Sequence, residues 1–289
     1  MNRFYLLAIL LVSIGCTTKV CDIGAISVTS KDISYRARVS EVYYPGSGKD
    51  YVGLAQLLKG YLSEEVLKSL GHKVDSSVIE AEAKRIDENT KAPEVLARIK
   101  EIYGRNRKAY LKTFVRVVYA ERVLYNEVFL NSKEIHKDQY QKAQGFLKAV
   151  LGSPASFEKI ARKKGLDVRR LRLSKSEGIM PLESQKTKLP LREASGSGGE
   201  MAARLRGLLN GVKEGKVYPQ VIEWQEGYQV IRLLKKKGDT AVIESMSVPK
   251  RDYDDWFWEK AKAVPVKIYD KAIKNKLLNE VSWAKQLFL

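Results

Sequence analysis

The apolar residues of this chain keep a helical spacing as far as residue 129 and lose it after about residue 139. Before that change they recur every three or four residues, so they lie along one face of each successive helix. After it, short helices alternate with runs that have the pattern of half-buried strands. We therefore expect an α+β fold, with a helical domain followed by a smaller β-rich domain. The first helical stripe consists of Leu54, Leu57, Leu58, Tyr61 and Leu62.

Glycine and proline mark the ends of the predicted helices. Gly71 follows the first stripe, Pro93 suits the first turn of a later helix, and Gly104 ends that helix. One long helix is expected from about Arg105 to Phe129. Because the faces opposite the stripes carry Lys and Arg, packing alone explains these helices, and we assign their stripes to a core.

The second half contains several stretches with the character of strands, separated by a helix at Met201–Leu209. Beyond Pro249 we expect an aromatic helix, an extended segment at Val264–Tyr269 and a terminal helix. We divide the chain into a helical domain at 25–135, a β-rich domain at 136–240 and a segment at 241–289 that packs back on both. The predicted strands are Val168–Leu173, Lys216–Trp224, Tyr228–Leu234 and Ala241–Val248.

The N-terminus has the features of an export signal. A short basic start is followed by an apolar run from Phe4 to Ile14, which is too short to span a bilayer core, since that takes ~20 residues. The segment Leu11–Cys16 resembles a bacterial lipobox, which implies cleavage before Cys16 and acylation of that residue. Ser13 stands where the favoured residue is Leu, so ordinary cleavage after Gly15 is the alternative. We assign residues 1–15 to a signal peptide and 16–24 to a lipid-attached tether.

The state of Cys21 depends on that assignment. If Cys16 is acylated, Cys21 has no partner in the chain and either stays reduced in the tether or pairs with another chain. If Cys16 is not acylated, a bridge between the two cysteines is possible.

The charge balance suggests an anionic partner. The chain has 52 Lys and Arg against 34 Asp and Glu, a formal charge of +18, and removal of residues 1–15 leaves 51 − 34 = +17. For an exported protein we assign this charge to contact with an anionic membrane surface or envelope polymer, and we expect no nucleic acid. Two His and two Cys are too few for a zinc-finger array, a disulfide scaffold or a His-rich metal site, and we predict no metal and no cofactor. Of the two His, His72 is expected to be exposed or to cap a helix, and His136 to be a solvated linker residue.

Short motifs between residues 156 and 231 occur in an order that resembles one family. Ser156–Ala161 is similar to a D-F-x-x-L-A helix, Met201 and Leu205 stand where the family has Met and Phe, Val212–Pro219 is similar to its L-K-x-G-E-[IV]-S segment, and Gly227–Ile231 is similar to its last strand. The family is that of exported peptidyl-prolyl isomerases and chaperones of the SurA and PrsA type. The resemblance implies a helical chaperone domain, a parvulin-like domain and a C-terminal segment that returns to the first.

The chain departs from this family at the residues that carry out isomerisation. Gln229 replaces the His of the last strand, and no His-Ile-Leu strand opens the domain. By resemblance, Met201, Leu205, Tyr228 and Gln229 are candidates for an apolar peptide or proline pocket, with no catalytic residue. We expect weak or absent isomerase activity, and we expect residues 241–248 to pair in the sheet where the first strand is missing.

The resulting hypothesis is a lipid-anchored chaperone of the periplasm or cell envelope that binds unfolded or partly folded exported proteins. Tyr253 and Trp258 are candidates for client contact, although aromatic residues of that helix can equally be core. The alternatives are an active parvulin-type isomerase and a structural envelope lipoprotein that binds one fixed partner.

Overall fold

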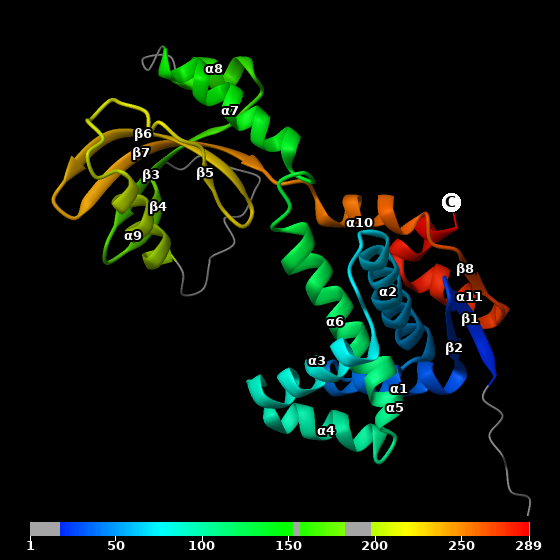
Figure 1. The fold of residues 1–289 in the computed structure, drawn as a ribbon. Coiled ribbons are helices and arrows are strands. Elements are labelled where there is room, and N and C mark those ends of the chain that lie inside the picture. The colour runs from blue at the N-terminus through cyan, green and yellow to red at the C-terminus, as the bar shows by residue number, and fades with distance from the viewer. Residues whose placement is uncertain (1–17, 153–156, 183–197, 289) are drawn as a thin grey trace, which may run out of the picture. The chain divides into compact units, whose positions relative to one another are not determined.

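The computed structural model describes residues 18–152, 157–182 and 198–288. The predicted α+β class is confirmed, and the chain divides into two compact units (Figure 1). The helical unit combines the chain up to Val128 with the part from Tyr253 onward, and the insert unit is Phe129–Asp252.

The helical unit packs helices from both ends of the chain and adds a small antiparallel sheet in the order β2-β1-β8. A capping box between Thr29 and Asp32 starts its first helix, and Pro93 and Gly104 begin and end the fourth as predicted. The elements are β1 (Lys19–Ile23), β2 (Ile26–Thr29), α1 (Ser30–Tyr43), α2 (Asp50–Ser69), α3 (Ser76–Asn89), α4 (Pro93–Tyr103), α5 (Arg107–Tyr110), α6 (Arg116–Arg122), α10 (Tyr253–Ala261), β8 (Val266–Ile268), α11 (Lys271–Glu280) and a 3₁₀ turn (Ser282–Leu287).

The segment assigned to a tether differs from the prediction, because residues 19–23 form strand β1. This strand pairs with β2 on one side and with β8 on the other, so Cys21 and Ile23 are fully buried. Burial raises the pKa of the Cys21 thiol to about 12. Cys21 is therefore a core residue, and the sequence missed this because β8 comes from the far end of the chain.

The long helix expected from about Arg105 to Phe129 is confirmed in extent, since helical turns run without interruption from Arg107 to Phe129, but it is not α-helical throughout. Helices α5 and α6 are followed by π-helical stretches at Leu111–Val115 and Val123–Phe129, respectively. A π turn adds one residue between hydrogen-bonded partners, so it shifts the apolar stripe around the axis without breaking the helix. Apolar spacing alone does not reveal such a shift.

The insert unit is built on an antiparallel sheet in the order β4-β3-β7-β6-β5. Strand β7 pairs with β3 on one side and β6 on the other, so the predicted pairing of residues 241–248 is confirmed. Of the predicted strand at 216–224, only Ile222–Glu223 is regular, with an isolated bridge at Val217. The elements are α7 (Lys137–Leu151), α8 (Phe157–Lys163), β3 (Val168–Ser174), β4 (Gly178–Pro181), α9 (Gly198–Leu208), β5 (Ile222–Glu223), β6 (Gly227–Lys237) and β7 (Thr240–Pro249).

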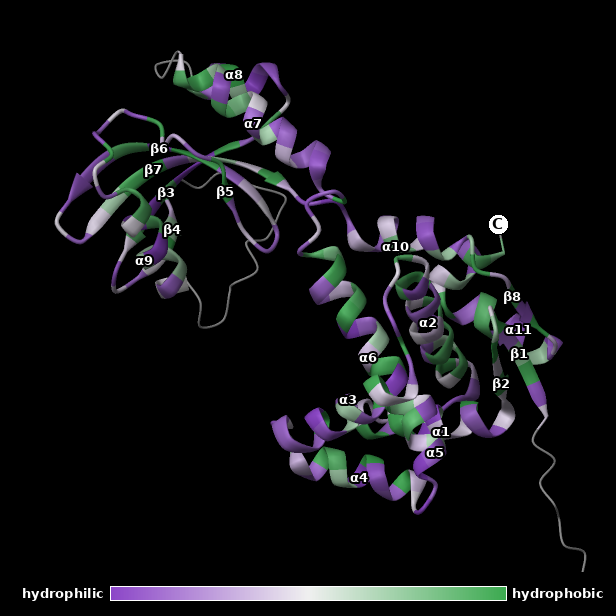
Figure 2. Ribbon diagram, viewed as in Figure 1, coloured by the Kyte–Doolittle hydropathy of each residue, from purple (hydrophilic) through white to green (hydrophobic). Residues whose placement is uncertain are grey.

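Two apolar clusters cover the two faces of this sheet. Figure 2 shows the apolar residues of its strands in green. Helices α7 and α8 pack on one face against Tyr228, Val230 and Met246. Helix α9 packs on the other face against Ile231 and Ile243. Successive residues of one strand therefore pack into different apolar clusters.

The two ends of the insert unit are joined to each other. Lys250 Nζ donates to the carbonyl of Leu130 at 2.6 Å, and the backbone N–H of Arg251 donates to His136 Nδ1 at 3.3 Å. These contacts, with the pairing of β7, place the unit boundaries at 128/129 and 252/253 rather than at 135/136 and 240/241.

Candidate functional site

The four proline-pocket candidates do not form one pocket, because the insert sheet separates them. Met201 and Leu205 on α9 belong to the cluster on the α9 face. Tyr228 is 2% exposed and belongs to the cluster on the opposite face. Since side chains alternate along β6, Gln229 lies on the α9 face with Met201 and Leu205.

The corner around Gln229 holds polar groups that do not titrate near neutral pH. Trp224 Nε1 donates to Gln229 Oε1 at 3.0 Å, and the guanidinium of Arg204 lies 4.7 Å from the centroid of the Trp224 ring. Leu205 is 1% exposed, so its side chain packs in the core and is not open to the ring of a proline ligand. The buried hydroxyl of Ser245 has no hydrogen-bond partner. This corner can donate and accept hydrogen bonds, but it offers no acid or base for proton transfer.

Of the two candidates for client contact on α10, only Trp258 is buried in the core. Trp258 is 6% exposed and stacks on Trp283 with ring centroids 5.0 Å apart, which makes its assignment to client binding wrong. Tyr253 is half-buried and contacts Tyr125 and Phe257. Burial raises the pKa of the Tyr253 hydroxyl. The aromatic residues of this short helix therefore pack within the helical unit, in agreement with the alternative that they are core residues.

His136 is fully buried, so its assignment to a solvated linker is wrong. Its Nε2 donates to the carbonyl of Phe129 at 2.8 Å, because a carbonyl can only accept, and its Nδ1 accepts the N–H of Arg251. Both ring nitrogens are thus used within the backbone of the insert unit. Burial lowers the pKa of His136, which favours the neutral ring. His72 is exposed after the end of α2, as predicted.

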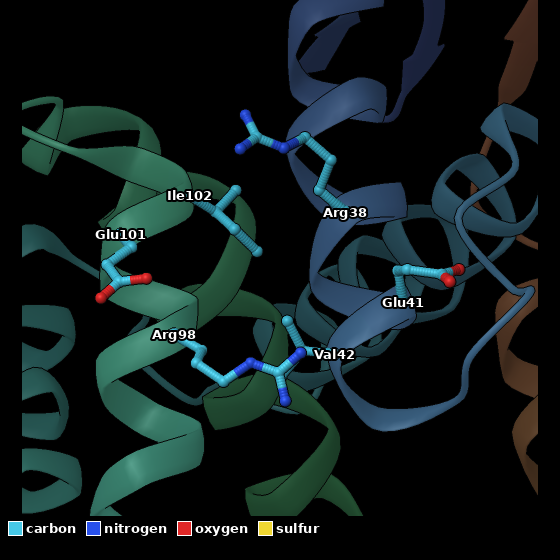
Figure 3. A pocket seen from close by; sticks show the side chains of 6 residues that line it. All are labelled: Arg38, Glu41, Val42, Arg98, Glu101 and Ile102. Atoms are coloured by element: carbon cyan, nitrogen blue, oxygen red, sulfur yellow. The ribbon is translucent and has the colours of Figure 1, made fainter.

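An open hollow of about 300 Å³ lies between α1 and α4 in the helical unit (Figure 3). This volume is at the lower end of the range for ligand pockets. Its apolar floor is formed by one half-buried side chain from each helix. The six residues that line it are Arg38, Glu41, Val42, Arg98, Glu101 and Ile102.

Two exposed tyrosines continue the surface at the end of α1. Tyr43 is 51% exposed and Tyr44 is 70% exposed. The loop that follows is folded back onto α1, because Glu41 accepts the backbone N–H of Gly46 at 2.8 Å and of Gly48 at 2.6 Å. The Gly-Ser-Gly-Lys sequence of this loop is therefore organised by a carboxylate, which excludes its use as a phosphate cradle in this conformation.

None of the hollow's residues was singled out from the sequence. The signal available was the pair of adjacent tyrosines before Pro45, since neighbouring exposed aromatic residues at the end of a helix can mark an interaction site. The arginines gave no signal, because the chain is rich in Lys and Arg throughout.

Three further predictions concern the N-terminal segment, metal binding and the membrane. Cys16, the signal peptide and the start of the tether lie outside the described residues. Within the described ranges, no group of three or more His, Cys, Asp or Glu is arranged to hold a metal ion. The described helices include none with the length and apolar character needed to cross a bilayer.

No family model, no curated protein and no solved structure matches the chain.

Proposed function

We propose that the protein is an exported chaperone that binds unfolded or partly folded segments on its helical unit. The observation that carries this proposal is the open hollow between α1 and α4, which Val42 and Ile102 help to line, with Tyr43 and Tyr44 exposed directly after Val42 in the chain. Exposed tyrosines provide a large contact area at a low entropic cost, which suits the binding of varied segments.

The order of the elements supports a similarity to the SurA and PrsA type. Both ends of the chain build the helical unit, and a β-rich unit is inserted between them. Strand β7 lies at the centre of the insert sheet, and the proposed similarity would give it the place of the family's first strand. In a chaperone of this kind the inserted unit has to be stable. Strand β7 contributes to that stability because it pairs with a neighbouring strand on each side and leaves no gap in the sheet.

We propose that the insert unit has no isomerase activity. Isomerisation of a prolyl bond requires a site that binds the twisted amide better than the planar one, against a barrier of about 20 kcal/mol. At the corner of Met201, Leu205 and Gln229 the apolar residue Leu205 is already packed, and no His is present.

We further propose that the protein acts at a membrane of the cell envelope, held by a lipid on Cys16. The insert unit carries much of the positive charge, with 25 Lys and Arg against 14 Asp and Glu in residues 129–252, a formal +11. Such a charge favours an anionic surface by about 1 kcal/mol for each Lys or Arg that lies near it.

Two assays on the same preparation test the proposal. Heat-unfolded citrate synthase should scatter less light in the presence of a few equivalents of the protein, and Tyr43→Ser with Tyr44→Ser should lose much of that effect. Exposed Tyr140→Ser, in the insert unit, is the matched control. Unchanged aggregation with the wild-type protein would reject the chaperone function.

The second assay measures cis–trans exchange of a proline tetrapeptide, and the uncatalysed rate is expected. Catalysis that Met201→Ala abolishes would instead establish the isomerase alternative.

A further inference from the structure

We infer that the hollow between α1 and α4 selects acidic client segments, in which a carboxylate side chain stands beside an apolar one. This inference rests on the proposed function and specifies its substrate class. The observations that support it are the two arginines that line the hollow without an acidic partner in the part of the chain that the structure describes, and the apolar side chains that lie between them.

The two arginines of the hollow have no acidic partner among the described residues. Elsewhere in the helical unit, Arg116 binds Glu64 through two nitrogens and Arg122 binds Glu82. Arg38 and Arg98 form no ion pair with any described residue. Figure 3 shows their guanidinium groups on either side of Ile102 in the view. A guanidinium remains charged at any physiological pH and presents a planar fork that matches a carboxylate.

The two acids of the hollow do not neutralise these arginines. The carboxylate of Glu41 accepts two backbone N–H groups of the following loop, which hold its pKa below the usual range. Figure 3 shows the carboxylates of Glu41 and Glu101 pointing away from the guanidinium groups. The centre of the hollow is therefore left with positive charge, and its acids stand at the rim.

The floor between the arginines is apolar. Val42 from α1 and Ile102 from α4 are both half-buried, so each keeps part of its side chain open to a ligand. An occupant that satisfies all of these groups has a carboxylate for a guanidinium and an apolar group for the floor. A peptide segment with Asp or Glu next to Phe or Leu has this chemistry.

A peptide fits these features better than a lipid headgroup. An anionic membrane would bring many phosphates against Glu41 and Glu101 at the rim, where like charges repel. A peptide instead brings backbone N–H groups, for which a rim carboxylate is an acceptor.

The test compares three fluorescein-labelled nonapeptides of the same length. One alternates Glu with Phe, the second has Gln for Glu, and the third has Lys for Glu. Fluorescence anisotropy with the full-length protein should give a dissociation constant about tenfold lower for the acidic peptide than for the amide peptide, because a charge-assisted hydrogen bond is stronger than a neutral one.

The double variant Arg38→Gln with Arg98→Gln should remove this preference. Arg105→Gln is the matched control, because Arg105 is exposed, lies just after α4 and does not line the hollow. Circular dichroism and the Tm of each variant show whether the fold is kept. If the double variant fails to fold, Val42→Gln, which leaves both arginines in place, should weaken all three peptides alike.

Equal affinity for the three peptides, or a preference that survives the double variant, would overturn the inference. Sedimentation with vesicles containing phosphatidylglycerol completes the test: binding to vesicles that depends on Arg38 and Arg98, without a peptide preference, would assign the hollow to lipid. The chaperone proposal is decided separately, since suppression of aggregation without an acidic preference would overturn only the inference drawn here.

Discussion

At the scale of single residues, the helical unit holds a buried cation, two of whose nitrogens have no hydrogen-bond partner among the described residues. Arg36 on α1 is 9% exposed, and its Nε and Nη1 bond to no other group. Burial lowers the pKa of this guanidinium, and the nearby Glu121 opposes that effect. Burial in turn raises the pKa of Glu121. The pair is thus desolvated without the hydrogen bonds that usually offset the cost.

A double-mutant cycle on this pair should show its cost. Glu121→Gln alone leaves Arg36 uncompensated and is expected to destabilise the protein. Adding Arg36→Met should recover about 1–4 kcal/mol, because an apolar side chain replaces an unpaired buried charge. Urea unfolding of the four proteins measures these changes. A double variant no more stable than Glu121→Gln would contradict the expectation.

His136 makes stability depend on pH. Its pKa is lowered in the folded state by burial and by Lys250 and Arg251, while the bond to Phe129 and the charge of Glu223 act in the opposite direction. Between the folded pKa and the ordinary value near 6.5, the unfolded chain binds more protons, so stability rises with pH in that window. The contribution of His136 is complete above about pH 6.5 and is lost as the pH falls through the folded pKa.

The variant His136→Gln isolates this contribution. The wild-type protein should lose more stability than the variant between pH 7.5 and pH 5, as measured by urea unfolding at each pH. His72→Gln is the control, because His72 is exposed and should leave the wild-type slope unchanged. Parallel pH profiles for wild type and His136→Gln would refute the assignment.

At the scale of elements, helix packing depends on where glycine allows close approach. Gly53 on α2 lies against the backbone of α1, and a Cβ at this position would come within 2.5 Å of the Ile33 carbonyl oxygen and 2.8 Å of the Ala37 nitrogen. Backbone atoms cannot move aside as a flexible side chain can. Gly145 on α7 is exposed and would meet nothing within 4 Å.

Two identical substitutions should therefore have opposite effects. Gly53→Ala is expected to destabilise the protein by about 1–3 kcal/mol or more, because it overpacks the contact between α1 and α2. Gly145→Ala should stabilise it by roughly 0.5–1 kcal/mol, because alanine restricts the unfolded chain and fits the helix. Denaturant midpoints decide this, and a stabilising Gly53→Ala would contradict the packing of α1 on α2.

At the scale of the whole molecule, elements from the C-terminal part of the chain complete the small sheet and the helix packing of the N-terminal part. Strand β8 extends the sheet of β1 and β2, and α10 packs on α2 with Phe257 fully buried. The helical unit is therefore discontinuous in sequence, and it can form only after residues beyond 252 are available. The insert unit is continuous, although its last strand lies at the centre of its sheet.

Truncating a core side chain near the C-terminus should thus destabilise the helical unit. Phe257→Ala is expected to cost about 3–5 kcal/mol, the usual effect of removing a buried aromatic ring. Hydrogen exchange should show the loss of protection in α2, which α10 covers. Lys262→Ala, at an exposed position just after α10, is the control and should change stability by less than about 0.5 kcal/mol. Unaltered protection of α2 would show that α10 is dispensable.

The sequence by itself determined the elements whose signals are local. Apolar spacing, Pro93 and Gly104 predict α4, and alternation predicts β3, because these patterns depend on neighbours only a few residues away. The mixed α+β class followed from the same local signals. The pairing of residues 241–248 followed from them together with the requirement that backbone groups at the centre of a sheet have hydrogen-bond partners.

Only the tertiary structure decided which side chains are buried and which are brought together. Cys21 is core because β8 arrives from the far end of the chain, and Trp258 is core because Trp283 covers it. Tyr228 and Leu205 are separated because a sheet passes between them. Arg38 and Arg98 become one site because α1 and α4 pack side by side, a contact that no local pattern contains. Burial and contact depend on residues far apart in the chain, and the physics of neighbouring residues does not encode them.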